Sequence, residues 1–90
     1  MSNIVLTDFS AVWCGPCRMQ DPIIDELKKK YGNTVSFVKI DVDEDVEPTN
    51  KYKIMAVPTL ILEKDGEIIK RYVGVTSQEE LEKDIKNVLK

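Results

Sequence analysis

Apolar positions recur along the chain with two spacings, and the change from one spacing to the other marks the expected elements. Residues 4–11 form a mostly apolar run of strand length, whereas the pattern over residues 19–31 has helical spacing. Residues 34–42 alternate enough to predict a second strand, and Gly32-Asn33 supplies a helix stop before it. Because a helix connects these two strands, we expect them to be parallel and the connection to be right-handed.

The next part of the chain predicts a short helix followed by a hairpin. Acidic residues and Pro48 begin a short helix that ends near Tyr52, and we interpret these acids as a solvated helix start rather than a metal cluster. Residues 59–63 and 68–73 then flank an Asp65-Gly66 pair, which is a turn signal. We therefore expect two antiparallel strands joined by a tight turn.

A capping box predicts the start of the last helix, because Ser77 is followed three residues later by Glu80. The helix after this box carries an apolar stripe that would pack on the sheet, formed by Leu81, Ile85, Val88 and Leu89. The complete order is strand, helix, strand, helix, strand, strand, helix. This order predicts an α/β domain.

Length and charge restrict the classes of function. The chain has 90 residues, of which 42% are hydrophobic, so we expect one domain with a modest core over residues 1–90. The formal net charge is −3 and basic residues are interleaved with acidic ones, which provides no basic surface for nucleic acid. No apolar stretch has the length of a membrane span, and the first residues lack the features of a signal peptide. We expect a cytoplasmic protein that binds neither nucleic acid nor membranes.

The two cysteines of the chain carry its most informative chemistry. They lie in Trp13-Cys14-Gly15-Pro16-Cys17, where a two-residue gap lets one helical turn bring the sulfurs together. Cys14 falls at a strand-to-helix junction, where unpaired backbone N–H groups and the helix dipole favour a thiolate. We therefore predict that Cys14 is the nucleophile and that Cys17 resolves the mixed disulfide formed with a substrate.

Three other interpretations of the cysteine pair are less favoured. A zinc site normally needs four ligands, and the sequence has no second cysteine pair and no histidine, so we expect no metal. A structural disulfide across two residues would stabilise the fold little, because it closes so short a loop. Two inert thiols are disfavoured by Pro16, which marks a helix start and places Cys14 at the exposed end of the helix.

This motif resembles the thioredoxin family along essentially the whole chain when it is taken with Asp8, Pro22, Val57-Pro58-Thr59 and Gly74. The resemblance implies a thioredoxin-like α/β fold with a central four-stranded mixed sheet flanked by three helices, lacking the first strand and helix of the full-length pattern. It also implies a protein-disulfide reductase whose redox group is the Cys14–Cys17 disulfide, with no separate cofactor. The implied partners are disulfide-containing proteins and a thioredoxin reductase or equivalent electron donor, and we expect a monomer.

Two alternatives to a thioredoxin-type reductase stay open. Glutaredoxins share the shortened plan, which allows a glutathione-linked oxidoreductase, although Cys-Gly-Pro-Cys after Trp13 resembles thioredoxin more than the Cys-Pro-Tyr-Cys usual in glutaredoxins. The same fold can also serve as a binding module without turnover. Retention of both cysteines and of Asp8 argues against that second alternative.

Two charged residues interrupt apolar strands and need an explanation. Asp8 lies among apolar neighbours, where burial would raise the pKa of its carboxyl group toward neutrality. By resemblance, Asp8 sits below Cys17 and takes the proton of the Cys17 thiol, directly or through water. Lys39 resembles the lysine adjacent to this aspartate, which would moderate its charge. The simpler alternatives are that Asp8 lies at a frayed strand end and that Lys39 extends into solvent.

A proline opens the predicted third strand and would complete the site. X-Pro bonds are the ones at which a cis peptide is readily adopted, although a trans proline that merely starts the strand is the alternative. By resemblance, this loop pairs through its backbone with an extended substrate segment, and Gly74 keeps a further loop low beside it. The substrate-binding residues implied by the resemblance are Trp13, Gly15, Pro16, Ala56, Val57, Pro58 and Gly74.

The chain departs from the family pattern at a few positions near the motif. Ser10 stands where thioredoxins commonly have a second tryptophan, which makes the packing lighter and more polar. Gln20 and Asp21 stand where apolar residues are common, and we expect them to alter the partner surface. Arg18 places a positive charge close to the dithiol, which also favours a thiolate. Pro22 has a structural role, because it should kink the helix.

Overall fold

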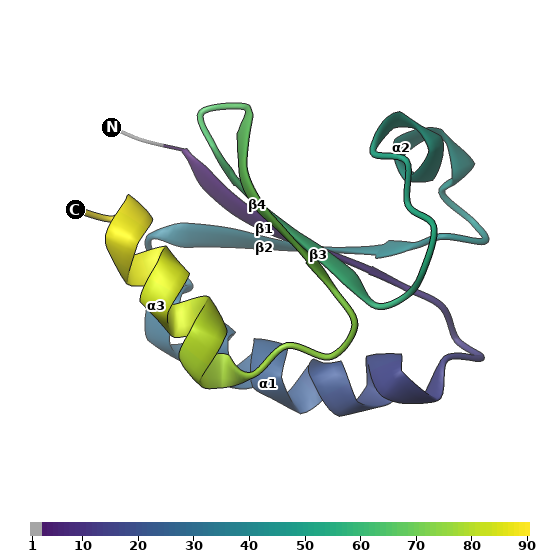
Figure 1. Ribbon diagram of the computed structural model, residues 1–90. Helices are drawn as coiled ribbons and strands as arrows, with labels where there is room; N and C mark the ends of the chain where they lie inside the picture. The colour runs from purple at the N-terminus through teal and green to yellow at the C-terminus, as the bar shows by residue number, and fades with distance from the viewer. Residues whose placement is uncertain (1–2) are drawn as a thin grey trace.

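The computed structural model describes residues 3–90, and within this range the chain forms four strands and three helices in the predicted order (Figure 1). The periodic pattern placed the first helix four residues too late, because the helix already starts at the glycine and proline of the cysteine motif. The elements are β1 (Ile4–Ser10), α1 (Gly15–Tyr31), β2 (Val35–Asp41), α2 (Val46–Lys51), β3 (Thr59–Lys64), β4 (Glu67–Val73) and α3 (Gln78–Val88).

The strands form one mixed sheet in the order β2-β1-β3-β4, which confirms the predicted fold class. β1 runs parallel to β2, as expected for a strand-helix-strand unit, and antiparallel to β3, which in turn pairs antiparallel with β4. In this register Asp8 of β1 lies opposite Lys39 of β2 on one side and opposite Leu60 of β3 on the other. Both residues of the expected charged pair therefore lie on neighbouring strands.

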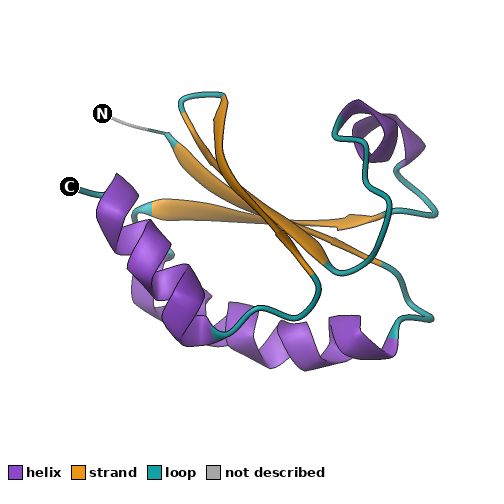
Figure 2. Cartoon of the chain, in the orientation of Figure 1, coloured by secondary structure: helices purple, strands orange, loops and turns teal. Residues whose placement is uncertain are grey.

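The helices divide unequally between the two faces of the sheet. Figure 2 shows α1 and α3 together along one face, with α2 on the other side. The main core fills the space between the sheet and the first pair of helices, and its central members are Leu6, Leu27, Leu60, Leu62, Leu81 and Ile85, each at most 1% exposed. Phe9 points to the opposite face, where its ring lies 5.6 Å from that of Tyr52 just after α2. The carboxyl end of β1 is thus covered on both faces.

Local signals in the second half of the chain act as predicted. Asp65 and Gly66 have positive φ angles of 52° and 86°, the conformation that a tight two-residue hairpin turn requires. The side chain of Ser77 accepts a hydrogen bond from the backbone N–H of Glu80 at 3.2 Å and so caps α3. Leu89 differs from the expectation: it is the residue that ends α3, and it is 39% exposed rather than packed on the sheet.

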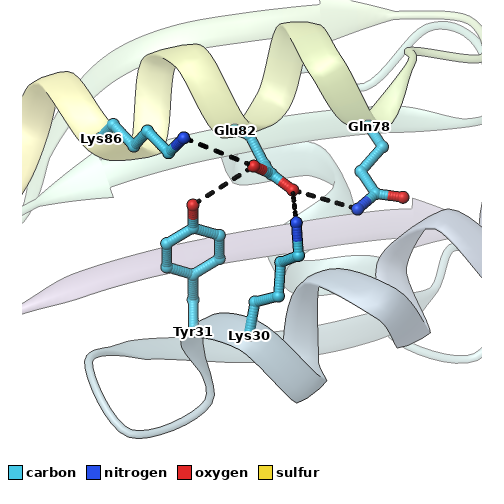
Figure 3. Close-up of polar contacts among 5 residues, drawn as sticks. All are labelled: Lys30, Tyr31, Gln78, Glu82 and Lys86. Carbon is cyan, nitrogen blue, oxygen red and sulfur yellow. Dashed lines mark hydrogen bonds and ion pairs between the residues drawn. The ribbon is translucent and has the colours of Figure 1, made fainter.

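One carboxylate ties the end of α1 to α3 (Figure 3). Glu82 accepts hydrogen bonds from Lys30 at 2.8 Å, Gln78 at 3.0 Å and Tyr31 at 3.4 Å, and Lys86 lies 3.8 Å away. The hydrogen bond from Lys30 is the largest cause that lowers the pKa of Glu82 to about 2, and Gln78 and the charge of Lys86 act in the same direction. The network therefore links the last turn of α1 to α3 through side chains.

Gln20 is fully buried on α1, so the prediction that it belongs to the partner surface is wrong. Its amide donates to the carbonyl of Thr76 at 3.0 Å and accepts from the N–H of Thr76 at 2.8 Å. A buried amide needs such partners, and the backbone of the loop after β4 supplies both. In residues 3–90 no helix has the length and apolar character needed to cross a membrane.

Candidate active site

The two cysteines form a disulfide at the start of α1, with their Cα atoms 5.3 Å apart. Cys14 is the N-cap residue in an extended conformation, and the backbone N–H of Cys17 donates to its sulfur at 3.1 Å. Gly15 and Pro16 form the exposed first turn between them. This backbone donor and the helix N-terminus both favour negative charge on Cys14 Sγ once the disulfide is reduced.

Exposure does not distinguish the two cysteines in this oxidised form. Cys14 is 4% exposed and Cys17 is 3% exposed, so the prediction that Cys14 lies at an exposed end is wrong for the disulfide state. The reason is local packing, because Ala11, Val42 and Val57 cluster around the pair. The difference between the sulfurs lies in their surroundings, since Cys14 faces the N–H group of the helix start and the loop before β3.

The loop before β3 lies close to the disulfide through its backbone. The Val57–Pro58 peptide bond is cis, and the carbonyl oxygen of Val57 lies 3.7 Å from Cys14 Sγ. Gly74, with φ of +90°, donates its N–H to the carbonyl of Pro58 at 2.8 Å, so the loop after β4 lies beside the proline loop. A positive φ of this size suits glycine and disfavours other residues. The structure therefore brings together Cys14, Val57, Pro58 and Gly74, as the resemblance implied.

Exposed apolar side chains line a groove next to the disulfide, since Val42 and Val57 contact both. Trp13 is 67% exposed and Met55 is 95% exposed, and both line a groove of about 240 Å³ together with Val42, Thr49, Ile54, Ala56 and Val57. The indole N–H of Trp13 donates to Asp43 at 2.7 Å, which holds the ring over this groove. Met55 and Asp43 are not among the site residues predicted from the sequence. The position of Met55 next to the predicted loop residue Ala56 was the available signal for it.

Asp8 is a buried carboxyl group on β1. It is 3% exposed, and its Oδ1 atom has no hydrogen-bond partner among residues 3–90. Burial raises the pKa of Asp8 to about 6, an effect that the charge of Lys39 opposes and the charge of Asp21 reinforces. Asp8 is therefore not at a frayed strand end, and the expected upward direction of its pKa is confirmed.

Lys39 combines the two interpretations made for it. Its side chain is 59% exposed and its ammonium group forms an ion pair with Asp21 at 3.0 Å rather than with Asp8. The hydrogen bond to Asp21 is the largest cause that raises the pKa of Lys39, so the ammonium stays charged. Lys39 thus extends toward solvent and still lowers the pKa of the neighbouring Asp8 carboxyl. No sequence pattern indicates that Asp21 is the partner of Lys39.

Two cavities that share Asp21 and Lys39 in their linings show where the predicted proton acceptor lies. Asp8 lines a cavity of about 210 Å³ between β1, β2 and α1, whereas Cys17 lines a separate cavity of about 500 Å³. Arg18 also borders the second cavity, and its guanidinium group donates to the carbonyl of Val12 at 3.1 Å. No group of three or more His, Cys, Asp or Glu side chains in the described part of the chain is arranged to hold a metal ion.

Comparisons with known proteins agree with this geometry. The sequence profile of the thioredoxin family matches residues 1–87. The chain is 44% identical to the thioredoxin of Listeria monocytogenes over 83 residues, which cover 92% of this chain and 81% of the relative. It is 46% identical to the thioredoxin of Bacillus subtilis over 80 residues, which cover 89% of this chain and 77% of the relative. The chain belongs to the thioredoxin family.

A solved thioredoxin supports the same assignment at the level of the fold. Mitochondrial thioredoxin 3 of Saccharomyces cerevisiae, in its oxidized form, superposes with a TM-score of 0.85 at 40% sequence identity. The match covers 94% of this chain and 78% of the yeast chain. The chain is accordingly a protein-disulfide oxidoreductase of the thioredoxin type, and the glutaredoxin-like alternative is not favoured. Its redox group is a disulfide that the protein itself provides.

Proposed function

We propose that the two cysteines of this thioredoxin-family protein divide the reaction between them. The Cys14 thiolate attacks one sulfur of a substrate disulfide, forming a mixed disulfide while the other substrate sulfur leaves and takes a proton. Cys17 then loses its proton and attacks Cys14 Sγ, which releases the second substrate thiol and closes the Cys14–Cys17 disulfide. The two electrons that reduce the substrate come from the dithiol. The N–H donated to Cys14 Sγ is the observation that carries this assignment.

Asp8 is proposed to accept the proton that Cys17 loses. A carboxyl group with a pKa of about 6 is mostly ionised at neutral pH and is still a better base than an ordinary aspartate. Asp8 and Cys17 line separate cavities, so we expect the proton to pass through water rather than through a direct contact. Lys39 tunes the strength of this base through its charge.

The substrate is proposed to bind across the loops beside the disulfide. An extended segment would pair with the backbone of Val57, which already faces Cys14 Sγ. The exposed apolar groove would take the side chains that flank the substrate cysteine. The substrate-binding set consists of Trp13, Gly15, Pro16, Ala56, Val57, Pro58 and Gly74.

We place this reaction in a cytoplasmic cycle of electron transport. Disulfide-containing proteins are the proposed substrates, and a thioredoxin reductase or an equivalent donor restores the dithiol. We propose that residues 1–90 act as one domain, as a monomer and without a separate cofactor. Such a protein binds neither nucleic acid nor membranes.

Trapping the mixed disulfide tests the division of labour. Cys17→Ser lacks the resolving sulfur, so it should accumulate mixed disulfides through Cys14, whereas Cys14→Ser should accumulate few. The measurement is mass spectrometry of adducts with a reducible protein such as insulin. Adducts found mainly on Cys17 would overturn the assignment. Insulin reduction by dithiothreitol, with and without the unmodified protein, tests for turnover in parallel.

A further inference from the structure

One ion pair borders both the cavity of Asp8 and the cavity of Cys17. Asp21 of α1 and Lys39 of β2 are joined at 3.0 Å, and both residues border the cavity that contains Asp8 and the cavity that contains Cys17. The pair is the side-chain contact that these two cavities have in common. A proton relay through water in these two cavities would therefore pass this ion pair.

The charged groups around Asp8 are few, and they come from two elements. From α1, Asp21, Asp25 and Lys28 border its cavity, and β2 supplies Lys39. β3 places the apolar Leu60 opposite Asp8. Lys39 is the directly opposed residue on the parallel strand, so its ammonium group is the cation best placed to neutralise Asp8.

Asp21 acts on Asp8 in two ways that have the same sign. Its own negative charge disfavours ionisation of Asp8, and its hydrogen bond holds the Lys39 ammonium group at the exposed mouth of the cavity. Exposed ion pairs contribute little to stability, and the two side chains are 41% and 59% exposed. The contact is therefore better explained by the position in which it holds the Lys39 ammonium group than by any stabilisation of the fold.

We propose that Asp21 is a positioning residue for disulfide exchange, which holds Lys39 away from Asp8 and so preserves Asp8 as a base for the Cys17 proton. This inference rests on the proposed role of Asp8. In the step concerned, the proton of the Cys17 thiol passes to the Asp8 carboxylate, and the Cys17 sulfur keeps the electron pair with which it attacks Cys14. Asp21 undergoes no change in bonding.

Carboxyl titration of Asp8 by NMR in the oxidised protein tests the proposal without any need for catalysis. Asp21→Asn removes one negative charge and frees Lys39, so the midpoint of Asp8 should fall by at least roughly 0.5 pH unit. Asp25→Asn is the matched control, because Asp25 borders the same cavity one helical turn later and has no ion pair with Lys39. An unchanged or raised midpoint in Asp21→Asn, or an equal shift in the control, would overturn the proposal.

A second pair of variants separates positioning from simple charge. Asp21→Glu keeps the carboxylate, so the Asp8 midpoint in this variant should stay close to that of the unmodified protein. In the background of Lys39→Met, the Asp21→Asn change should have a smaller effect, because no ammonium group is left to release. A full effect in that background would show that Asp21 does not act through Lys39.

The rate of the resolving step links the titration to function. In single-turnover experiments, the acid limb of the pH profile should move to lower pH in Asp21→Asn by the same amount as the Asp8 midpoint. A shifted midpoint with an unshifted rate profile would refute the catalytic role of Asp8 and leave the contact between Asp21 and Lys39 intact. A rate profile that moves while the midpoint stays fixed would refute the positioning role.

Discussion

Replacing Asp8 by asparagine should raise stability and slow catalysis, because both properties follow from one buried carboxyl group. Asp8 is 3% exposed, and its pKa rises from an ordinary 3.8 to about 6 in the folded protein. Burial is the largest cause of this rise, and the nearby ammonium group of Lys39 only partly offsets it. The folded state must therefore carry an unfavourable charge at neutral pH.

The direction of the pH effect follows from proton binding. The folded state binds the Asp8 proton more tightly than the unfolded state does, so ionisation of Asp8 favours unfolding. The resulting loss of stability begins as the pH rises above about 4 and levels off once the pH passes about 6. A shift of this size corresponds to about 3 kcal/mol at neutral pH, as an order of magnitude.

Unfolding by urea at two pH values isolates the contribution of Asp8 ionisation to the free energy of unfolding. Asparagine does not ionise, but its buried amide can lack partners, at a cost of about 1–3 kcal/mol that does not depend on pH. The quantity to compare is therefore the difference in free energy of unfolding between the two oxidised proteins, and how this difference changes with pH. From about pH 4 to about pH 7.5, Asp8→Asn should gain about 2 kcal/mol relative to the unmodified protein. Asp25→Asn, an exposed neighbour at the same cavity, is the control and should show no such gain.

The same variant should resolve mixed disulfides at least about tenfold more slowly at neutral pH, because general bases typically contribute more than that. Single-turnover release of substrate from the mixed disulfide measures this step. A stability difference that is the same at both pH values would refute the argument from burial. An unchanged rate at every pH would refute only the role of Asp8 as base.

Two further predictions concern Cys14 and Glu82. The reduced Cys14 thiol should react with iodoacetamide at lower pH than a free thiol does, because a backbone N–H and the helix N-terminus stabilise its thiolate; an ordinary reactivity profile would contradict this. Glu82→Gln should lower Tm at neutral pH. Because the folded pKa of Glu82 is depressed to about 2, the stabilising effect of Glu82 is lost as the pH falls from about 4.5 toward 2. The Tm values of Glu82→Gln and the unmodified protein should therefore converge at low pH, and values that stay apart would contradict the network.

The order of the elements was predictable because it depends on local patterns. Period-two and helical spacing, the Asp65-Gly66 turn and the Ser77 cap are properties of neighbouring residues, and the structure has each of them. Periodicity alone placed the start of α1 too late, because Gly15 and Pro16 carry no apolar pattern, whereas Pro16 as a helix-start signal located it correctly. Pattern alone therefore located the elements better than their ends.

The cysteine motif was predictable as chemistry, but its burial was not. The spacing of Cys14 and Cys17 defines the disulfide, whereas their low exposure depends on Val42 and Val57, which approach from distant parts of the chain. The burial of Asp8, by contrast, was predictable, because its neighbours in the sequence are apolar. The ion-pair partner of Lys39 was not predictable, because Asp21 lies on a different element and a sequence pattern does not show which side chains of two elements come into contact.

Gln20 and Asp21 illustrate why two adjacent departures from the family pattern can have opposite outcomes. Successive residues of a helix point about 100° apart, so Gln20 enters the core while Asp21 faces β2. Gln20 binds the backbone of Thr76, whose hydroxyl donates to the carbonyl of Gly74 at 3.1 Å, and it thereby ties α1 to the loop beside the proline. Asp21 ties the same turn of α1 to Lys39. Gln20 and Asp21 thus anchor neighbouring positions of α1 to two different parts of the site, the loop after β4 and strand β2.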